Sequence, residues 1–306
     1  MKNRNMETGK QYHRPVLCKE AIDALQIKPS GIYVDATFGG GGHARVILNS
    51  LDDGRLIAFD QDEDAAGNIP EEDSRFMLIP ENFRYLNRFL RVHDALPVSG
   101  ILADLGVSSH QFDTVERGFS IRGDAPLDMR MDRRQSKTAA DVIRKYRMED
   151  LWRIFEDYGE VRNARSLAER LTELRQRFPL KTIGELKNAI IPLVRGNERR
   201  YLAQVFQALR IEVNDEMAAL QEFLDQAATA LEPGGRLVVI SFHSVEDRTV
   251  KKFMKEGKPE NKEVAEEKEG HLLKAVFKKP VLPGKEEIKQ NKRAASAKMR
   301  VAEKIK

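Results

Sequence analysis

The stretch Tyr33-Val-Asp-Ala-Thr-Phe-Gly-Gly-Gly-Gly-His-Ala44 decides the fold class of this chain. An apolar run leads into four consecutive glycines and then into helix-like spacing, so we expect a buried strand, a tight turn and a helix. Gly39, Gly41 and Ala44 match the G-x-G-x-x-A form of the nucleotide-binding fingerprint, in which bare backbone lets a ligand approach closely. Alone this match is weak, because any sharp turn from a strand into a helix favours glycine.

A carboxylate closes the next apolar run, Leu56-Ile-Ala-Phe-Asp60, 21 residues after Gly39. At that place an acid accepts hydrogen bonds from both hydroxyls of a ribose, and the alternative is that Asp60 caps a helix. Asp35 stands just before the glycine turn, where an acid repels a phosphate and attracts an ammonium group. S-adenosylmethionine carries an ammonium and a sulfonium but no phosphate, so the pattern favours this cofactor over a dinucleotide.

Further short apolar runs extend the pattern along the chain. We expect strands at 32–36, 56–59, 76–79, 101–105 and 237–241, with helices between the first four. Strands that alternate with helices predict βαβ units, and hence an α/β fold with a doubly wound, mainly parallel sheet.

The alternation stops after residue 105. Residues 106–132 are rich in Gly, Asp, Arg and Met and are typical of a long ordered loop, and helical spacing follows up to residue 231. We therefore expect three parts: a first core part at 1–111, an inserted helical domain at 112–212, and a second core part at 213–306 with a basic C-terminal tail.

Charge is unevenly distributed over the 306 residues, whose net charge is only +4. Residues 112–212 hold 21 Lys and Arg, of which 17 are Arg, against 16 Asp and Glu, and residues 248–306 hold 18 against 9. Arginine binds phosphate in a bidentate way and stacks on bases, so the excess of arginine in residues 112–212 indicates RNA binding. A solvated, salt-bridged helical surface explains the charge equally well.

Composition also excludes several classes of protein. The single cysteine, Cys18, excludes an intramolecular disulfide and a zinc site built from thiolates, and the scattered histidines show no metal-ligand spacing, so we expect no metal. Neither a secretory signal nor an apolar run of membrane-spanning length is present, which makes a cytoplasmic protein the expectation.

The run Ile101-Leu-Ala-Asp-Leu-Gly-Val-Ser-Ser109 holds the candidate catalytic residue, Asp104, at the end of the fourth strand. In a doubly wound sheet this strand end lies beside the cofactor crevice. A carboxylate there would accept a hydrogen bond from an exocyclic amine, and this would localise the nitrogen lone pair for in-line attack on a methyl group. The Pro-Pro-aromatic sequence that follows the acid in many base-amine methylating enzymes is absent, and a helix-capping Asp is the alternative.

The last motif, Ser241-Phe-His-Ser-Val-Glu-Asp-Arg248, follows the final predicted strand. Ser, His and Asp together suggest a hydrolase, but neither a G-x-S-x-G elbow nor a signal for an oxyanion hole is present. We expect His243 and Ser244, together with Ser108 and Ser109, to line the substrate side of the pocket. A polar turn from a strand into a helix is the alternative.

Seven strings in order make the chain resemble the ribosomal RNA small subunit methyltransferase H family, the 16S rRNA cytosine-N4 methyltransferases. The strings are Tyr12-His-Arg-Pro-Val-Leu17, Thr37-Phe-Gly-Gly-Gly-Gly-His43, Asp104-Leu-Gly-Val-Ser-Ser109, Arg117-Gly-Phe-Ser120, Pro126-Leu-Asp-Met-Arg-Met-Asp132, Phe206-Gln-Ala-Leu-Arg-Ile211 and the motif at 241–248.

The resemblance implies a class I, Rossmann-like methyltransferase core whose inserted helical domain recognises the substrate. It implies methyl transfer from S-adenosylmethionine to N4 of a cytidine in the decoding region of bacterial 16S rRNA, within the small ribosomal subunit. By position, it implies cofactor contacts at Gly41, Gly42, His43, Asp60, Phe83, Asp104 and Gln111.

Two other readings stay open at this stage. One is a methyltransferase that acts on another amine, such as adenine N6 or a protein side chain, and the other is a non-catalytic RNA-binding assembly factor. The oligomeric state is not readable from the sequence pattern, and a homodimer is among the options.

Overall fold

A seven-stranded sheet forms in the order β3-β2-β1-β4-β5-β7-β6. The computed structural model describes residues 15–70, 73–256 and 272–305. The five parallel strands are those expected from the sequence, and β7 is antiparallel to both β5 and β6, so the doubly wound, mainly parallel α/β sheet is confirmed. The strands are β1 (Ile32–Asp35), β2 (Arg55–Phe59), β3 (Phe76–Ile79), β4 (Val98–Asp104), β5 (Leu231–Ser241), β6 (Leu273–Ala275) and β7 (Lys298–Lys304).

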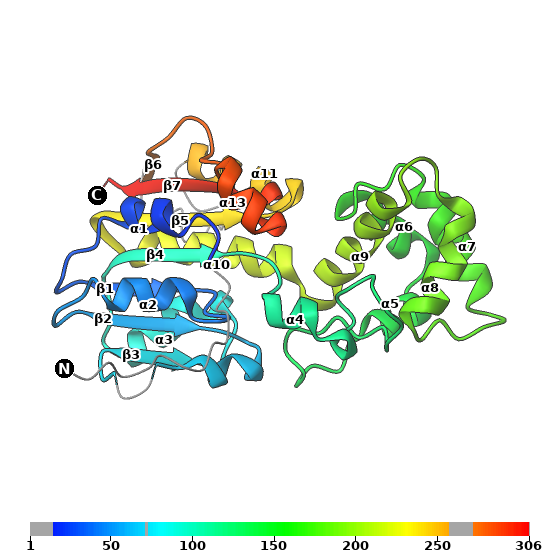
Figure 1. Cartoon of the computed structure of the whole chain (residues 1–306), viewed down its shortest axis with the longest axis horizontal. Coiled ribbons are helices and arrows are strands. Elements are labelled where there is room, and N and C mark those ends of the chain that lie inside the picture. Colours follow the sequence, from blue (N-terminus) through cyan, green and yellow to red (C-terminus); the bar gives the residue numbers. More distant parts are fainter. Residues whose placement is uncertain (1–14, 71–72, 257–271, 306) are drawn as a thin grey trace, which may run out of the picture.

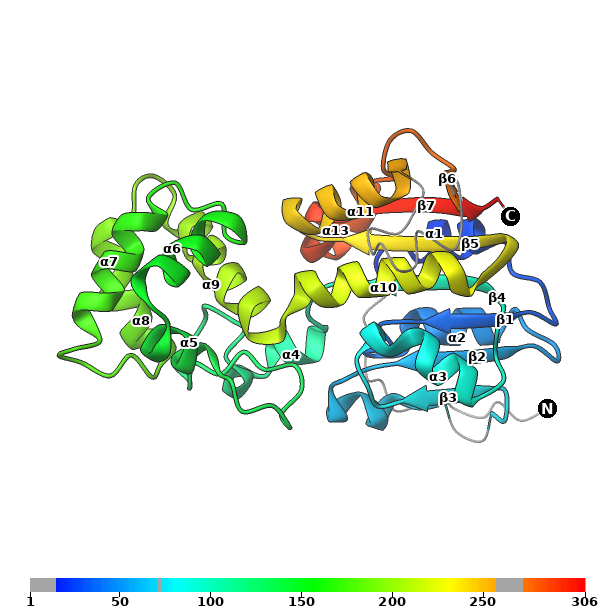
Figure 2. The same ribbon diagram turned by 180° about the vertical axis from the view of Figure 1, so that it is seen from behind.

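Helices cover both faces of the sheet because successive side chains of each strand point to opposite sides. In β2, Ile57 and Phe59 pack under α3 (Leu86–Val92), α10 (Glu216–Ala230) and α11 (Ser244–Glu256), the face seen in Figure 2. Leu56 and Ala58 pack on the opposite face, seen in Figure 1. The helices on that face are α1 (Cys18–Leu25) and α2 (Gly42–Leu48).

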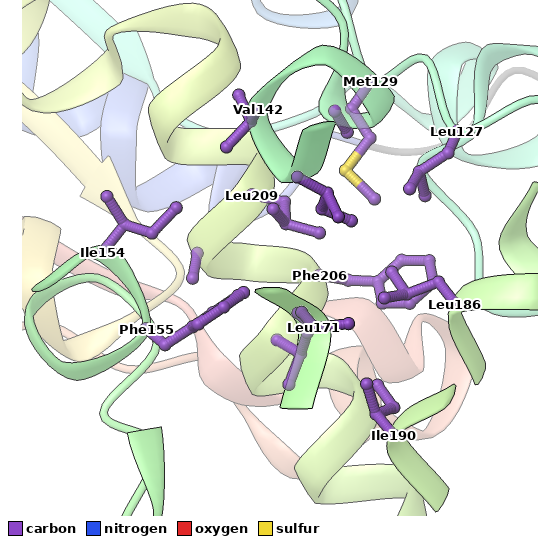
Figure 3. Close-up of a cluster of buried hydrophobic side chains, with 14 of the residues drawn as sticks. Leu127, Met129, Val142, Ile154, Phe155, Leu171, Leu186, Ile190, Phe206 and Leu209 are labelled. Carbon is purple, nitrogen blue, oxygen red and sulfur yellow. The ribbon is translucent and has the colours of Figure 1, made fainter. Parts of the chain in front are cut away.

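A second group of helices encloses its own hydrophobic core beside the sheet (Figures 1 and 2). Phe155, Leu171, Phe206 and Leu209 converge in this core from three different helices (Figure 3). The helices are α5 (Ala139–Lys145), α6 (Met148–Asp157), α7 (Ala164–Leu174), α8 (Ile183–Ile190) and α9 (Glu198–Asn214). Because this core is separate from the two cores of the sheet, the helical unit has its own source of stability.

Two connections join the helical unit to the sheet. The first runs from β4 through α4 (Ser109–Asp113) and η3 (Val115–Arg117) into a long loop that leads to α5. The second is the junction between α9 and α10, where Asp215 adopts a left-handed conformation with φ 51° and interrupts the helix. The boundaries expected from the sequence, after residues 111 and 212, therefore fall inside α4 and α9.

Two features of the sheet differ from the sequence expectation. Strand β7 was not expected, because its buried residues Met299 and Val301 alternate with charged ones in a lysine-rich tail. Strand β5 begins at Leu231, which pairs with Val98, whereas Arg236 pairs with Gly100, so residues 232–235 bulge out of the ladder.

The remaining short elements are η1 (Glu63–Asn68), η2 (Phe83–Tyr85), η4 (Ile191–Leu193), α13 (Lys285–Gln290) and η5 (Lys292–Ser296). Within the described residues, none of the helices combines the length and the apolar character that crossing a membrane requires.

Candidate active site

The glycine turn between β1 and α2 takes a shape that favours glycine. Gly39 and Gly41 have φ of +49° and +69°, the left-handed region that side chains disfavour. A Cβ on Gly41 would lie 2.9 Å from Cε2 of Phe38, and one on Gly42 would lie 3.0 Å from Cγ of Pro15. Gly39 and Gly41 therefore allow the sharp turn, Gly41 and Gly42 allow close packing, and Gly39, Gly40 and Gly42 leave bare backbone facing a cavity.

This cavity has a volume of about 710 Å³ and opens at the carboxyl ends of β1, β2 and β4. The strand order reverses between β1 and β4, which is where open α/β sheets bind their ligands. Helix α10 and the loop after η3 also contribute to the wall, so the cavity lies between the sheet and the inserted unit. Of the residues predicted to form the site, its lining includes Gly39, Gly42, His43, Asp60, Phe83, Asp104, Ser108, Ser109 and Gln111.

Asp60 ties the glycine turn to the end of β2. Its Oδ2 accepts a hydrogen bond from the Gly39 N–H at 2.7 Å, and its Oδ1 accepts one from the Asp62 N–H at 2.9 Å. Asp60 is not a helix cap, because Asp62 holds that position and accepts from the Asp64 N–H. Burial raises the pKa of Asp60 to about 6. Each carboxylate oxygen keeps a second lone pair, so the group can still accept hydrogen bonds from a ligand.

Asp35 lies behind the cavity wall and not on it. The side chain is 1% exposed; Oδ1 accepts a hydrogen bond from the Thr37 N–H at 3.1 Å, and Oδ2 has no hydrogen-bond partner among the described residues. Burial raises the pKa of Asp35 to about 7, and the charge of Asp60 adds to the effect. Direct contact with a ligand ammonium, as the sequence suggested, is therefore not what this geometry offers, and the charge of Asp35 acts from behind the wall.

Asp104 stands on the cavity wall at the end of β4, next to β1. Its N–H donates to Oγ1 of Thr37 at 2.6 Å, which holds the two strand ends together. In the carboxyl group, Oδ1 is buried without a hydrogen-bond partner among the described residues, and Oδ2 lies 3.8 Å from Nδ1 of His43. Burial, with the nearby charges of Asp35 and Glu246, raises the pKa of Asp104 well above its usual value. Asp104 does not cap the following helix, since Ser108 does.

His43 is a neutral neighbour of Asp104. Its side chain is buried, and Nε2 lies 3.1 Å from the carbonyl oxygen of Val16, which can only accept. Nε2 therefore carries the proton, and Nδ1 presents a lone pair toward Asp104. Burial lowers the pKa of His43 to about 4, so the ring is uncharged at neutral pH.

Ser108 and Gln111 build the wall through a capping box at the start of α4. The Ser108 hydroxyl accepts from the Gln111 N–H, and Oε1 of Gln111 accepts from the Ser108 N–H. The amide of Gln111 then donates to Oδ2 of Asp62 at 2.6 Å. These polar groups are largely occupied within the protein, so their contribution to the cavity is first of all its shape.

His243 and Ser244 do not line the cavity, contrary to the sequence expectation. Nε2 of His243 lies 3.0 Å from Oε1 of Glu246 at the start of α11, and the Ser244 hydroxyl donates to Oε2 of Glu160, in the inserted unit, at 2.6 Å. The polar turn from a strand into a helix, the alternative kept open for this motif, describes the geometry better. Phe242 and Glu246 are the residues of this motif that reach the cavity.

Glu216, His243 and Glu246 place three ligand atoms within 4.8 Å of one another, which is close enough for a metal ion. However, Arg210 donates to both carboxylate oxygens of Glu216, at 2.8 and 3.0 Å, and Oε2 of Glu246 accepts from the Phe242 N–H. A guanidinium at this distance already supplies the positive charge, so the cluster is an internal ion-pair network.

Several residues of the cavity wall were missed by the sequence reasoning. They come from η1, from the loop after η3, from the α9–α10 junction and from the C-terminal part: Asp62, Asp64, Met131, Asn214 and Arg293. Asp62 and Asp64 could have been predicted, because they form an Asp-x-Asp pair that begins two residues after Asp60. The others depend on which distant segments the fold brings together.

The site fits S-adenosylmethionine on three observations. The glycine turn leaves bare backbone at one end of the cavity, and Asp60 presents spare lone pairs beside it. Asp35 and Asp104 are acids with buried oxygens that have no hydrogen-bond partner among the described residues, and a sulfonium or an ammonium bound beside them would favour their ionised forms. This strand order, with an antiparallel β7 and a cavity at the switch point, defines a class I methyltransferase dependent on S-adenosylmethionine.

The chain belongs to the MraW methylase family, whose sequence profile matches residues 10–305. It is 53% identical to the ribosomal RNA small subunit methyltransferase H of Flavobacterium johnsoniae, over 98% of this chain and 100% of the relative. It is 54% identical to the protein of that name from Bacteroides fragilis, over 96% of this chain and 97% of the relative. An rRNA methylase from Streptococcus thermophilus overlaps in structure with a TM-score of 0.38 at 13% identity, over 94% of each chain.

Proposed function

We propose that this protein transfers a methyl group from S-adenosylmethionine to the N4 amino group of a cytidine in the decoding region of 16S rRNA. The observation that carries the proposal is Asp104, an acid on the wall of the cavity at the switch point of the sheet, with a buried oxygen that has no hydrogen-bond partner in the described part of the chain. The names of the relatives support ribosomal RNA of the small subunit as the substrate. Such a substrate implies action in the bacterial cytoplasm.

The residues that would hold the cofactor surround the glycine turn. Gly39, Gly41 and Gly42 keep the backbone open, Asp60 offers acceptors to the ribose, and Phe83 offers an apolar face to the adenine. When bound, S-adenosylmethionine supplies an electrophilic methyl group on a sulfonium. His43 and Gln111 support this end of the cavity through their contacts with Val16 and Asp62.

The chemical task of the protein is to make the amine nucleophilic. The lone pair of an exocyclic amine on cytosine is delocalised into the ring. Oδ1 of Asp104, which has no partner among the described residues, would accept a hydrogen bond from the amino N–H and hold the nitrogen in line with the methyl group. This role does not depend on whether the acid is ionised, because a neutral carboxyl group still has a carbonyl oxygen that accepts.

We further propose that residues 112–212 recognise the RNA, with help from the basic C-terminal part. The cavity lies between the sheet and the inserted unit, so a base must leave its stack to reach Asp104. An unpaired or locally opened site is therefore the expected target, and phosphate contacts by the arginines of the insert would make the affinity depend on salt. Ser109, which lines the same cavity as Asp104, belongs to the substrate side of this arrangement.

The test is methyl incorporation into unmethylated small ribosomal subunits, followed by mass analysis of the digested nucleosides. We expect N4-methylcytidine, and we expect Asp104→Ala to lower turnover by about 10²- to 10⁴-fold with little change in the affinity for S-adenosylhomocysteine. Asp53→Ala, at an exposed acid far from the cavity, is the matched control and should behave like the parent.

Three outcomes would count against the proposal. A product such as N6-methyladenine would show that another amine is the substrate. Binding of S-adenosylhomocysteine without any incorporation would support a non-catalytic factor. Full turnover by Asp104→Ala would remove Asp104 from the catalytic role.

A further inference from the structure

Arg117 is a buried cation that joins the cavity to the inserted segment. It lies in η3 and is 2% exposed. Its Nη1 contacts Oδ2 of Asp62 at 2.8 Å and Oδ2 of Asp64 at 2.8 Å, and its Nη2 donates to the carbonyl oxygens of Arg130 and Met131, each at 3.0 Å. One guanidinium therefore forms ion pairs with two carboxylates of the core and hydrogen bonds with two carbonyl groups of the inserted loop.

On the core side, these contacts lead to the ligand end of the cavity. Asp62 and Asp64 both line the cavity, and the Asp62 N–H donates to the carboxylate of Asp60. Gln111 and His110 reach the same two acids, since Gln111 donates to Asp62 and His110 lies 3.2 Å from Asp64. Asp62, one of the two acids that Arg117 contacts, is thus hydrogen-bonded to Asp60, the residue expected to bind the ribose.

On the inserted side, the contacts lead to the place where the helical unit is attached. Met131, whose carbonyl oxygen accepts from Arg117, also lines the cavity, and its N–H donates to Oδ1 of Asn214 at 2.7 Å. The Asn214 amide donates to the carbonyl oxygens of Met129 and Arg210, each at 2.8 Å. Asn214 is the last residue of α9, directly before the left-handed Asp215 where α10 begins.

We propose that Arg117 is a positioning residue that makes the binding of the cofactor and the binding of RNA cooperative. A ligand that fixes Asp62 and Asp64 also fixes the guanidinium between them, which in turn holds the loop at Met131 and, through Asn214, the junction between α9 and α10. The helical unit is then presented to RNA in one orientation. This inference rests on the proposed function, because it takes RNA as the ligand of the inserted unit.

The chemistry of arginine explains why this position holds that residue. Its planar fork bonds to the acids and to the carbonyl groups at the same time, whereas the ammonium of a lysine is a single point charge. Arg117→Lys therefore keeps the buried charge beside Asp62 but cannot span both sides. Asp64→Asn is a gentler change, because the Asp64 side chain is 35% exposed, and it weakens the same bridge from its core side.

The experiment measures the affinity for unmethylated small ribosomal subunits at one fixed salt concentration, with and without saturating S-adenosylhomocysteine. For the parent we expect the affinity to rise at least fivefold when S-adenosylhomocysteine is present, within the range that coupled sites show. For Arg117→Lys and Asp64→Asn we expect the ratio of the two affinities to fall to about one, while each ligand still binds. Lys19→Gln, at an exposed lysine on α1 outside residues 112–212, is the control for charge and should keep the parent ratio.

The ratio separates this role from a purely structural one. A residue that only stabilises the fold would lower the melting temperature and leave the ratio unchanged, and that result would overturn the inference. A ratio of one in the parent would overturn it as well. A parent that binds neither S-adenosylhomocysteine nor the subunits would refute the proposed function, and this inference with it.

Discussion

Asp35→Asn should stabilise the protein at alkaline pH while it weakens binding of the cationic cofactor. In the folded protein the pKa of Asp35 is about 7, against 3.8 for an ordinary aspartate, because the carboxyl group is buried. A folded-state pKa above the unfolded one means that the native state binds the proton more tightly. The parent therefore gains stability as pH falls through 7 toward 4, and it pays for the buried charge above pH 7.

The size of the effect follows from the shift. Each pKa unit is worth 1.36 kcal/mol, so the raised pKa of Asp35 destabilises the native state by about 4 kcal/mol at pH 8, relative to an unshifted carboxyl group. At pH 5, where the native carboxyl group is already protonated, the same shift costs about 2 kcal/mol. Asparagine keeps an oxygen for the Thr37 N–H, but it adds a buried N–H group whose cost of about 1–3 kcal/mol does not depend on pH. The advantage of the variant over the parent should therefore shrink by about 2–3 kcal/mol between pH 8 and pH 5.

Urea unfolding at the two pH values, with a common m-value, measures this difference directly. Asp53→Asn, at an exposed acid in the turn before β2, is the matched control and should show no such pH dependence. If Asp35→Asn and the parent differ by the same free energy at pH 5 and pH 8, the buried charge is not the cause and the reasoning fails.

Three further predictions follow from the site and the cores. Affinity for S-adenosylmethionine, measured by calorimetry, should fall as pH drops from 8 to 5.5, because Asp35 and Asp60, with pKa values of about 7 and about 6, take up protons and lose the charge that attracts a sulfonium. S-adenosylhomocysteine, which has no sulfonium, should show a smaller change, and equal pH profiles for the two ligands would contradict this prediction. Gly41→Ala should lower the free energy of unfolding by about 1–2 kcal/mol or more, since φ is +69° and the added Cβ meets an aromatic ring, whereas Gly40→Ala, where the Cβ meets nothing within 4 Å, should change it little. Phe206→Ala should destabilise the helical unit by about 3–5 kcal/mol and abolish RNA binding, yet leave S-adenosylhomocysteine bound to the sheet; joint loss of both ligands would show that the two cores do not act separately.

The parts of the fold that were predictable are those in which a single segment carries the whole signal. Strands β1, β2 and β4 are buried on both faces, so each appears as a short apolar run, and the glycine turn is visible because backbone with positive φ favours glycine. Strand β7 was invisible because charged residues separate its buried apolar ones, so no continuous apolar run marks it in the lysine-rich tail. Its place in the sheet is set by a partner strand, β5, that lies more than fifty residues earlier in the chain.

The candidate site shows the same division. Asp60 and Asp104 end strands, and parallel strands bring their carboxyl ends to one edge, so their meeting at the cavity could be foreseen. Ser244 was predicted to line the cavity, but at the start of α11 its hydroxyl group donates to Glu160 of the inserted unit. A contact between residues so far apart in the chain cannot be predicted from a local sequence pattern. Arg117 was noticed only as part of a family string, because its role depends on acids more than fifty residues earlier in the chain and on a loop that follows it.

The position of β7 has a consequence for the order in which the protein assembles during synthesis. The helical unit is built from one continuous stretch, so its core can close while the ribosome is still adding residues to the second half of the sheet. Strand β5, in contrast, keeps an unpaired edge until residues 298–304 have emerged and settled beside it. The sheet that holds the active site is therefore the last part of the protein to be completed. A nascent chain stalled before β7 would have a folded helical unit beside a sheet whose β5 edge is unpaired and prone to aggregation.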